Sequence, residues 1–168
     1  MSEKTRNLIL TIGGISVIFV IILLAGLFSN NNNDNKNKDG VLTVKENFFD
    51  FGMISMKNGN VSHRFALKNE NSETITIKKI YTSCMCTTAT LIDSNGEKRG
   101  IFGMPGHGDL SNIGFQIAGG ETIEIEAIFD PAAHGPEGIG PVKRIIYIET
   151  DSQTNPNLQL VIEARVAN

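Results

Sequence analysis

The 168-residue chain contains no tryptophan, 7% aromatic and 40% hydrophobic residues, so it has room for one ordinary folded domain beside its terminal segment. Its formal net charge of -3 offers no basic surface to phosphate backbones, which argues against nucleic acid as a partner. Two cysteines are too few for a small domain held together by disulfides.

The first element in the chain is an apolar stretch over residues 8–28 that carries no charged side chain. As a helix it is long enough to cross about 30 Å of hydrocarbon, so we expect one transmembrane helix. Lys4 and Arg6 precede it, and the positive-inside rule then places residues 1–7 in the cytoplasm and the rest of the chain outside. A cleaved signal peptide is the competing interpretation, but its apolar region is usually shorter, about 7–15 residues. We therefore expect a single-pass protein of the cell membrane with an extracytoplasmic C-terminal domain.

Residues 29–40 (SNNNNDNKNKDG) contain no apolar side chain, so nothing offsets the entropic cost of ordering them. The composition predicts a flexible tether. If it behaves as a coil, it holds the domain on the order of 20 Å from the membrane.

Residues 41–168 show short runs in which apolar and polar residues alternate, separated by turn residues, which is typical of half-buried β-strands. A first hairpin is expected around the turn at residues 69–72. About seven strands are expected, as in an immunoglobulin-like antiparallel sandwich, with a barrel as the alternative. The expected strands lie at residues 48–54, 61–67, 75–81, 87–92, 123–129, 144–150 and 158–166.

Four short motifs occur in order: DFG at residues 50–52, HRFALKN at 63–69, TSCMCT at 82–87 and FDP at 129–131. Together they resemble the domain-of-unknown-function family 1573, in which a short SCGCT signature follows the third strand. The resemblance implies an immunoglobulin-like module, often on secreted or anchored bacterial proteins, and no reaction. Met85 stands where the family usually has glycine, and residues 92–118 extend a connection that is shorter in the family.

Cys84 and Cys86 carry the chemical interest of the signature. On an extended strand, residues two apart point to the same face, so we expect two adjacent sulfurs with Met85 pointing away. A disulfide between them would be strained there, because extended Cα atoms two apart lie about 7 Å from each other. Three interpretations therefore stay open: a strained and reducible disulfide, a metal site for copper or zinc, and two inert buried thiols.

Further metal ligands come from two Gly/Pro-rich stretches, at residues 103–108 and 130–136. His107, Met104 and His134 complete a Cys/Cys/His/His zinc set or a thiolate/imidazole/thioether copper set. If the strands alternate in direction, residues 123–129 deliver His134 to the end of the sandwich that holds the cysteines. His107 begins at the opposite end, and its segment must fold back to reach them.

No phosphate-binding loop, dinucleotide-binding glycine motif, zinc-protease helix or nucleophile elbow occurs, so we expect no enzyme. The leading hypothesis is a membrane-anchored extracytoplasmic binding module that engages another envelope protein. The alternatives are a copper or zinc binding protein and a thiol redox protein.

Overall fold

The structure, a computed structural model, describes residues 41–106 and 112–168. All seven expected strands are present among them. Their positions, with those of three further strands and two short 3-10 helices, are β1 (Leu42–Val44), β2 (Phe48–Ser55), η1 (Met56–Asn58), β3 (Val61–Asn69), β4 (Ile75–Thr82), β5 (Thr87–Ile92), β6 (Lys98–Phe102), β7 (Phe115–Ile117), β8 (Thr122–Phe129), η2 (Gly135–Gly138), β9 (Gly140–Thr150) and β10 (Asn157–Ala167).

None of the helices in these described ranges has the length and apolar character needed to cross a membrane. The transmembrane helix expected at residues 8–28 and the tether expected at residues 29–40 both lie outside the described residues.

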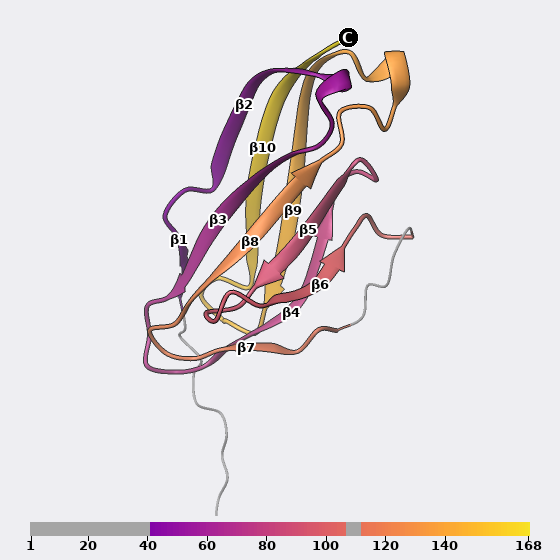
Figure 1. Cartoon of the computed structure of the whole chain (residues 1–168). Helices are drawn as coiled ribbons and strands as arrows, with labels where there is room; N and C mark the ends of the chain where they lie inside the picture. The colour runs from indigo at the N-terminus through magenta and orange to yellow at the C-terminus, as the bar shows by residue number, and fades with distance from the viewer. Residues whose placement is uncertain (1–40, 107–111) are drawn as a thin grey trace, which may run out of the picture. The chain divides into compact units, whose positions relative to one another are not determined.

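The strands form two five-stranded sheets, which confirms the expected all-β sandwich (Figure 1). One sheet has the order β1-β3-β8-β5-β6 and the other β2-β10-β9-β4-β7. An immunoglobulin-like sandwich has the same core strand orders in its two sheets. Here they are β1-β3-β8-β5 in one sheet and β4-β9-β10 in the other. Strands β6 and β7 are added at the same side of that framework, and both come from the extended connection at residues 92–118.

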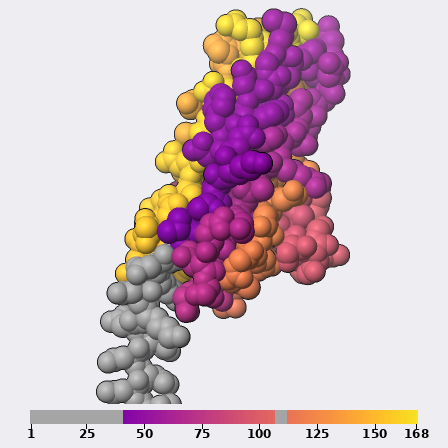
Figure 2. All heavy atoms as spheres, turned by 90° about the vertical axis from the view of Figure 1, so that its left-hand side faces the viewer, coloured from indigo at the N-terminus to yellow at the C-terminus, as the bar shows by residue number. Residues whose placement is uncertain are grey.

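Three details differ from the sequence-based expectation. The described residues hold ten strands rather than about seven. The three additional strands are β1 and β7, which have only three residues each and show no recognisable alternation, and β6, whose pairing with β5 contains a register shift. The sandwich is not purely antiparallel, since β2 lies parallel to β10 at the sheet edge visible in Figure 2. The expected hairpin is absent because β3 and β4 lie in different sheets. Alternation marks the buried face of a strand but does not specify its neighbour.

The core lies between the sheets and consists of the inward-facing side chains of nearly every strand. Phe65 on β3, Ile123 on β8 and Ile146 on β9 are buried, while the residues beside them along each strand are exposed or half-buried. Burial of these side chains is the main stabilising term of the fold.

The chain crosses between the two sheets several times, and two of these crossings lie at the same end of the sandwich. It passes from β4 to β5 through residues 83–86, and from β8 to β9 through residues 130–139. Thr87 at the start of β5 pairs with Phe129 at the end of β8, so the two crossings are neighbours. The first crossing carries both cysteines and the second carries His134.

Candidate functional site

The cysteines lie in a reverse turn that we call the cysteine turn (residues 83–86). The Thr87 amide donates to the Cys84 carbonyl over 3.1 Å, and the Thr82 hydroxyl donates to the Thr87 carbonyl over 2.9 Å. The expectation that Cys84 and Cys86 occupy an extended strand was therefore wrong. The chain must reverse here to change sheets, and a turn brings residues two apart closer than an extended strand does.

The crossing that carries His134, residues 130–139, is the histidine loop. The Asp130 amide donates to the Cys86 carbonyl over 2.9 Å, which attaches this loop to the cysteine turn. The Asp130 carboxylate accepts from the Ala132 amide over 2.8 Å and holds the loop's first bend. His134 then directly precedes the 3-10 helix η2, with an exposed side chain.

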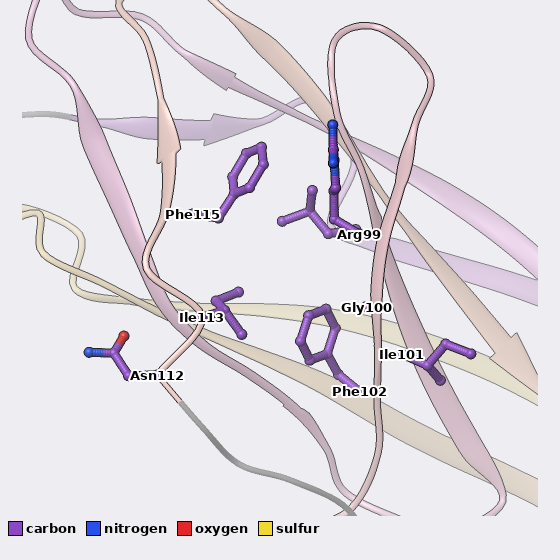
Figure 3. Close-up of a pocket in the computed structure, with 8 residues that line it drawn as sticks. Arg99, Gly100, Ile101, Phe102, Asn112, Ile113 and Phe115 are labelled. Atoms are coloured by element: carbon purple, nitrogen blue, oxygen red, sulfur yellow. The ribbon is translucent and has the colours of Figure 1, made fainter.

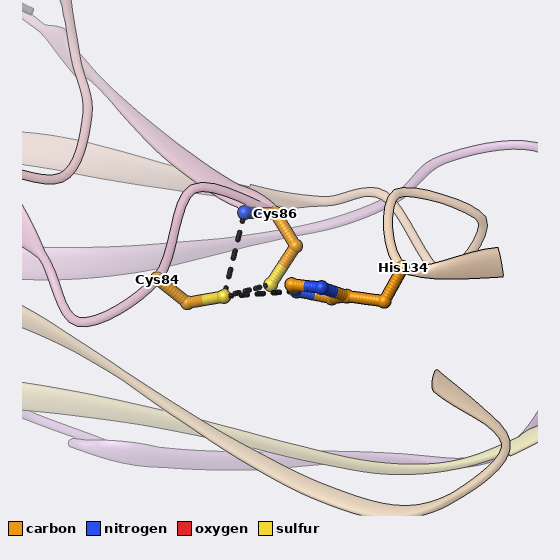
Figure 4. Close-up of side chains that lie close together, drawn as sticks. All are labelled: Cys84, Cys86 and His134. Atoms are coloured by element: carbon orange, nitrogen blue, oxygen red, sulfur yellow. Dashed lines mark hydrogen bonds between the residues drawn. The ribbon is translucent and has the colours of Figure 1, made fainter. Parts of the chain in front are cut away.

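The two crossings bring two sulfurs and one imidazole together, and we call Cys84, Cys86 and His134 the three-donor site (Figure 4). Cys84 Sγ lies 3.3 Å from His134 Nε2 and 2.6 Å from Cys86 Sγ. One ligand atom from each residue lies within 4.8 Å of the other two. The convergence of His134 with the cysteines, expected from strand directions, is present.

The exposure of the three side chains to solvent increases from Cys86 to Cys84 to His134. Cys86 is only 3% exposed and belongs to the hydrophobic core, Cys84 is half-buried, and His134 is exposed. Both cysteines are free thiols. A ligand of atomic size can therefore reach Cys84 and His134 from solvent, while Cys86 forms the inner wall.

Arg144 on β9 is a fourth member that the sequence analysis missed. Its Nε donates to Cys86 Sγ over 3.0 Å, and its Nη1 donates to the Lys143 carbonyl over 2.9 Å. Ser83 fixes the strand beside it, because its amide donates to the Ile145 carbonyl and its hydroxyl accepts from the Ile145 amide, each over 2.9 Å. Only the pairing of β4 with β9 places this cation near sulfur, and no local motif marks it.

These contacts separate the acidities of the two thiols. Burial raises the pKa of Cys84, but hydrogen bonds from Cys86 and His134 and the charge of Arg144 outweigh it and bring the pKa to about 7. Burial, followed by the hydrogen bond to Cys84, raises the pKa of Cys86. When the pair gives up one proton, that proton therefore comes from Cys84, and Cys86 remains a thiol.

The other two residues predicted as ligands have different outcomes. His107 lies outside the described residues. Met104 is half-buried, and it follows Gly103, whose carbonyl accepts from the Thr82 amide over 3.1 Å. The extended connection therefore does fold back, by way of β6, to the end of the sandwich that holds the cysteine turn.

A cleft of about 590 Å³ opens between β6 and β7, where the two sheets have their edges (Figure 3). Phe102, Ile113 and Phe115 line it with apolar surface. Arg99 also lines it, but its guanidinium is paired with the buried Asp93 carboxylate at 2.8 Å. Among the described residues that line it, this cleft gathers no set of reactive or metal-binding groups, so the three-donor site is the better candidate.

Residues 42–98 match the DUF1573 family, a protein family of unknown function. This match confirms the resemblance drawn from the short motifs. The DUF1573 match includes Cys84 and Cys86, whereas His134 and Arg144 lie beyond it. The residues that match the family thus include the cysteine turn, whereas His134 and Arg144 reach the turn from strands and loops outside the matched range.

One solved structure supports the fold. A protein of unknown function from Porphyromonas gingivalis W83 is similar over 80% of this chain and 51% of its own, with 15% identity and a TM-score of 0.57. The chain thus spans about half the length of that protein. A PapD-like domain of human CEP192 is similar over 79% of this chain and 89% of its own, with 10% identity and a TM-score of 0.48. The chain matches none of the curated proteins.

Proposed function

We propose that this DUF1573 chain is a metal-binding protein that holds copper or zinc at the three-donor site. The observation that carries the proposal is the convergence of Cys84, Cys86 and His134, with donor atoms within 4.8 Å of one another. Two thiolates and an imidazole are soft or borderline ligands, the donor set that copper and zinc prefer over calcium or magnesium.

The dimensions of the site fit such an ion with a small adjustment. Two sulfurs bound to one zinc at about 2.3 Å lie roughly 3.8 Å apart in tetrahedral geometry. The Cys84 and Cys86 sulfurs, now 2.6 Å apart, need to separate by about 1 Å. Rotation of the half-buried Cys84 side chain toward solvent can supply this movement, because Cys84 is not confined by the core on all sides.

Metal content tests the proposal. The full chain is purified reduced and without chelator in mild detergent, incubated with zinc or with copper(I), desalted and measured by mass spectrometry. We expect close to one ion per chain, lost in Cys84→Ser/Cys86→Ser and reduced in His134→Ala. His63→Ala is the matched control, because His63 is not one of the three donors and its ring stacks on that of Phe49 with the ring centroids 3.7 Å apart. Metal-free wild-type protein after both incubations would contradict the proposal.

The contact between the sulfurs also favours a second candidate, thiol–disulfide exchange. The Cys84 thiolate attacks a disulfide on a partner protein and forms a mixed disulfide, releasing one partner thiolate. Cys86 then gives up its proton and displaces the second partner thiolate, leaving a Cys84–Cys86 disulfide and a reduced partner. A reversible two-hydrogen change in the mass of metal-free protein on treatment with oxidised glutathione tests this candidate.

The place of the domain in the cell completes the proposal. An N-terminal transmembrane helix at residues 8–28 and the tether that follows it hold the domain outside the cytoplasm, where it acts without catalysing a reaction and meets other envelope proteins. The apolar stretch and the positive charges before it support this arrangement. Protease accessibility of the domain in intact cells tests it, and a domain protected until lysis would contradict it.

A further inference from the structure

Arg144 gives the three-donor site a fixed positive charge that is not a ligand. A guanidinium has five N–H donors, no acceptor, and a charge that proteins do not remove. Its Nε lies 3.0 Å from Cys86 Sγ, the Nη1–H donates to the Lys143 carbonyl, and the carbon of the guanidinium lies 5.9 Å from the centre of the Phe129 ring. Three contacts therefore hold this charge against the inner sulfur.

We propose that Arg144 makes the three-donor site selective for copper(I) over zinc(II). This inference rests on the proposed metal-binding function. Two thiolates and the guanidinium together carry one negative charge, which a monovalent ion neutralises. A divalent ion leaves one uncompensated positive charge beside a core cysteine that is 3% exposed.

Coulomb's law gives the size of the effect. An ion bound about 2.3 Å beyond Cys86 Sγ lies about 5 Å from the guanidinium. One extra unit of ionic charge at that distance lowers the binding constant by a factor between about 4 in bulk water and about 300 at the effective dielectric of a protein surface. The site is half-buried, so we expect a factor on the order of 10 or more.

The number and kind of donors favour the same ion. Within the described ranges, the site offers three ligand atoms, whereas structural zinc is almost always bound by four. Thiolates bind both ions, whereas a thioether suits copper(I) and is not among the usual ligands of zinc. The half-buried Met104 follows Gly103, whose carbonyl accepts from the amide of Thr82, two residues before Cys84, so the segment that carries this thioether passes beside the cysteine turn.

The test measures both affinities on the full chain, reduced and anaerobic in mild detergent. Copper(I) is titrated against a bicinchoninate indicator and zinc(II) against a chromophoric chelator, for wild type, Arg144→Gln, Arg144→Lys and Lys68→Gln. Lys68→Gln is the control for net charge, because Lys68 pairs with Thr122 at the start of β8, the end remote from the site. We expect Arg144→Gln to shift the ratio of the two affinities toward zinc on the order of 10-fold, while Arg144→Lys and Lys68→Gln stay near wild type.

The possible results separate the two claims. If wild type binds neither ion, the proposed function fails and the selectivity fails with it. If wild type binds the ions but Arg144→Gln changes their affinity ratio by less than twofold, the inference about Arg144 alone is wrong. Circular dichroism checks that each variant is folded. Should Arg144→Gln not fold, Arg144→Met, which keeps apolar contact with the Phe129 ring, replaces it.

Discussion

The acidity of Cys84 yields the sharpest prediction for the metal-free protein. With a pKa of about 7, half of the Cys84 thiols are ionised at pH 7, against about 1% for an ordinary cysteine with a pKa of 9.0. The less basic thiolate is intrinsically about tenfold less nucleophilic, given a Brønsted slope of roughly 0.5. Cys84 should therefore react with iodoacetamide at pH 7 about fivefold faster than an ordinary cysteine.

The assay follows the alkylation rate of Cys84 by mass spectrometry between pH 5.5 and 9.5 on reduced, metal-free protein. We expect a midpoint near pH 7 in wild type and a higher one in His134→Ala, which removes a hydrogen bond that stabilises the thiolate. His63→Ala should keep the wild-type midpoint, and urea-unfolded protein should show an ordinary cysteine. A folded wild-type midpoint above about 8.5 would refute the assigned roles of Cys86, His134 and Arg144.

Four further predictions concern the stability of the fold. Ile125→Ala removes a fully buried side chain from the core and should cost about 2–5 kcal/mol in urea denaturation, and a cost below 1 kcal/mol would contradict its core role. Thr82→Val deletes the hydroxyl that closes the cysteine turn and should cost about 1 kcal/mol and weaken metal binding, whereas unchanged affinity would show that the turn holds without it. Gly119→Ala places a Cβ 2.5 Å from a carbonyl oxygen of the β3–β4 connection and should destabilise the domain by about 1–3 kcal/mol, measurable in a thermal melt. The hydrogen bond from Lys98 lowers the pKa of Glu126. The ionised Glu126 carboxylate therefore stabilises the fold above the ordinary carboxyl pKa, and this stabilisation is lost as the pH falls through the lowered pKa. In Glu126→Gln, the free energy of unfolding should fall less steeply between pH 5 and 3 than in wild type.

The sequence allowed prediction where a repeating pattern or a geometric rule applies. Alternation located seven strands, since a half-buried strand must keep one face apolar over several residues. It missed β1 and β7 because three residues do not establish a period, and β6 because its register shifts around Gly100, which has a φ of +74°. The parallel pairing of β2 with β10 follows from packing between segments distant in sequence, which no local pattern encodes.

Some parts of the candidate site could likewise be predicted from the sequence and others could not. The position of His134 was predictable, because strands that alternate in direction bring the end of residues 123–129 and the cysteine signature to the same end of the sandwich. The turn at Cys84 and Cys86 was not, since SCMCT contains none of the glycine, proline, asparagine or aspartate residues that usually mark a turn. Arg144 was least accessible, because it acts through strand pairing with a segment some 60 residues away.

The location of the site explains how one small domain can combine a hydrophobic core with reactive sulfur. A sandwich buries its sheet faces but leaves its ends to the loops, and here the cysteine turn and the histidine loop, two crossings at one end, are joined by the bond from the Asp130 amide to the Cys86 carbonyl. Cys86 can belong to the core because its partners, Cys84 and Arg144, meet its sulfur from the solvent side. Under the proposed function, an ion bound there would link both crossings at once, and the free energy of metal binding would also stabilise the fold, by about 4 kcal/mol when free metal exceeds the Kd a thousandfold. The proposal therefore couples metal binding and stability through the same three side chains.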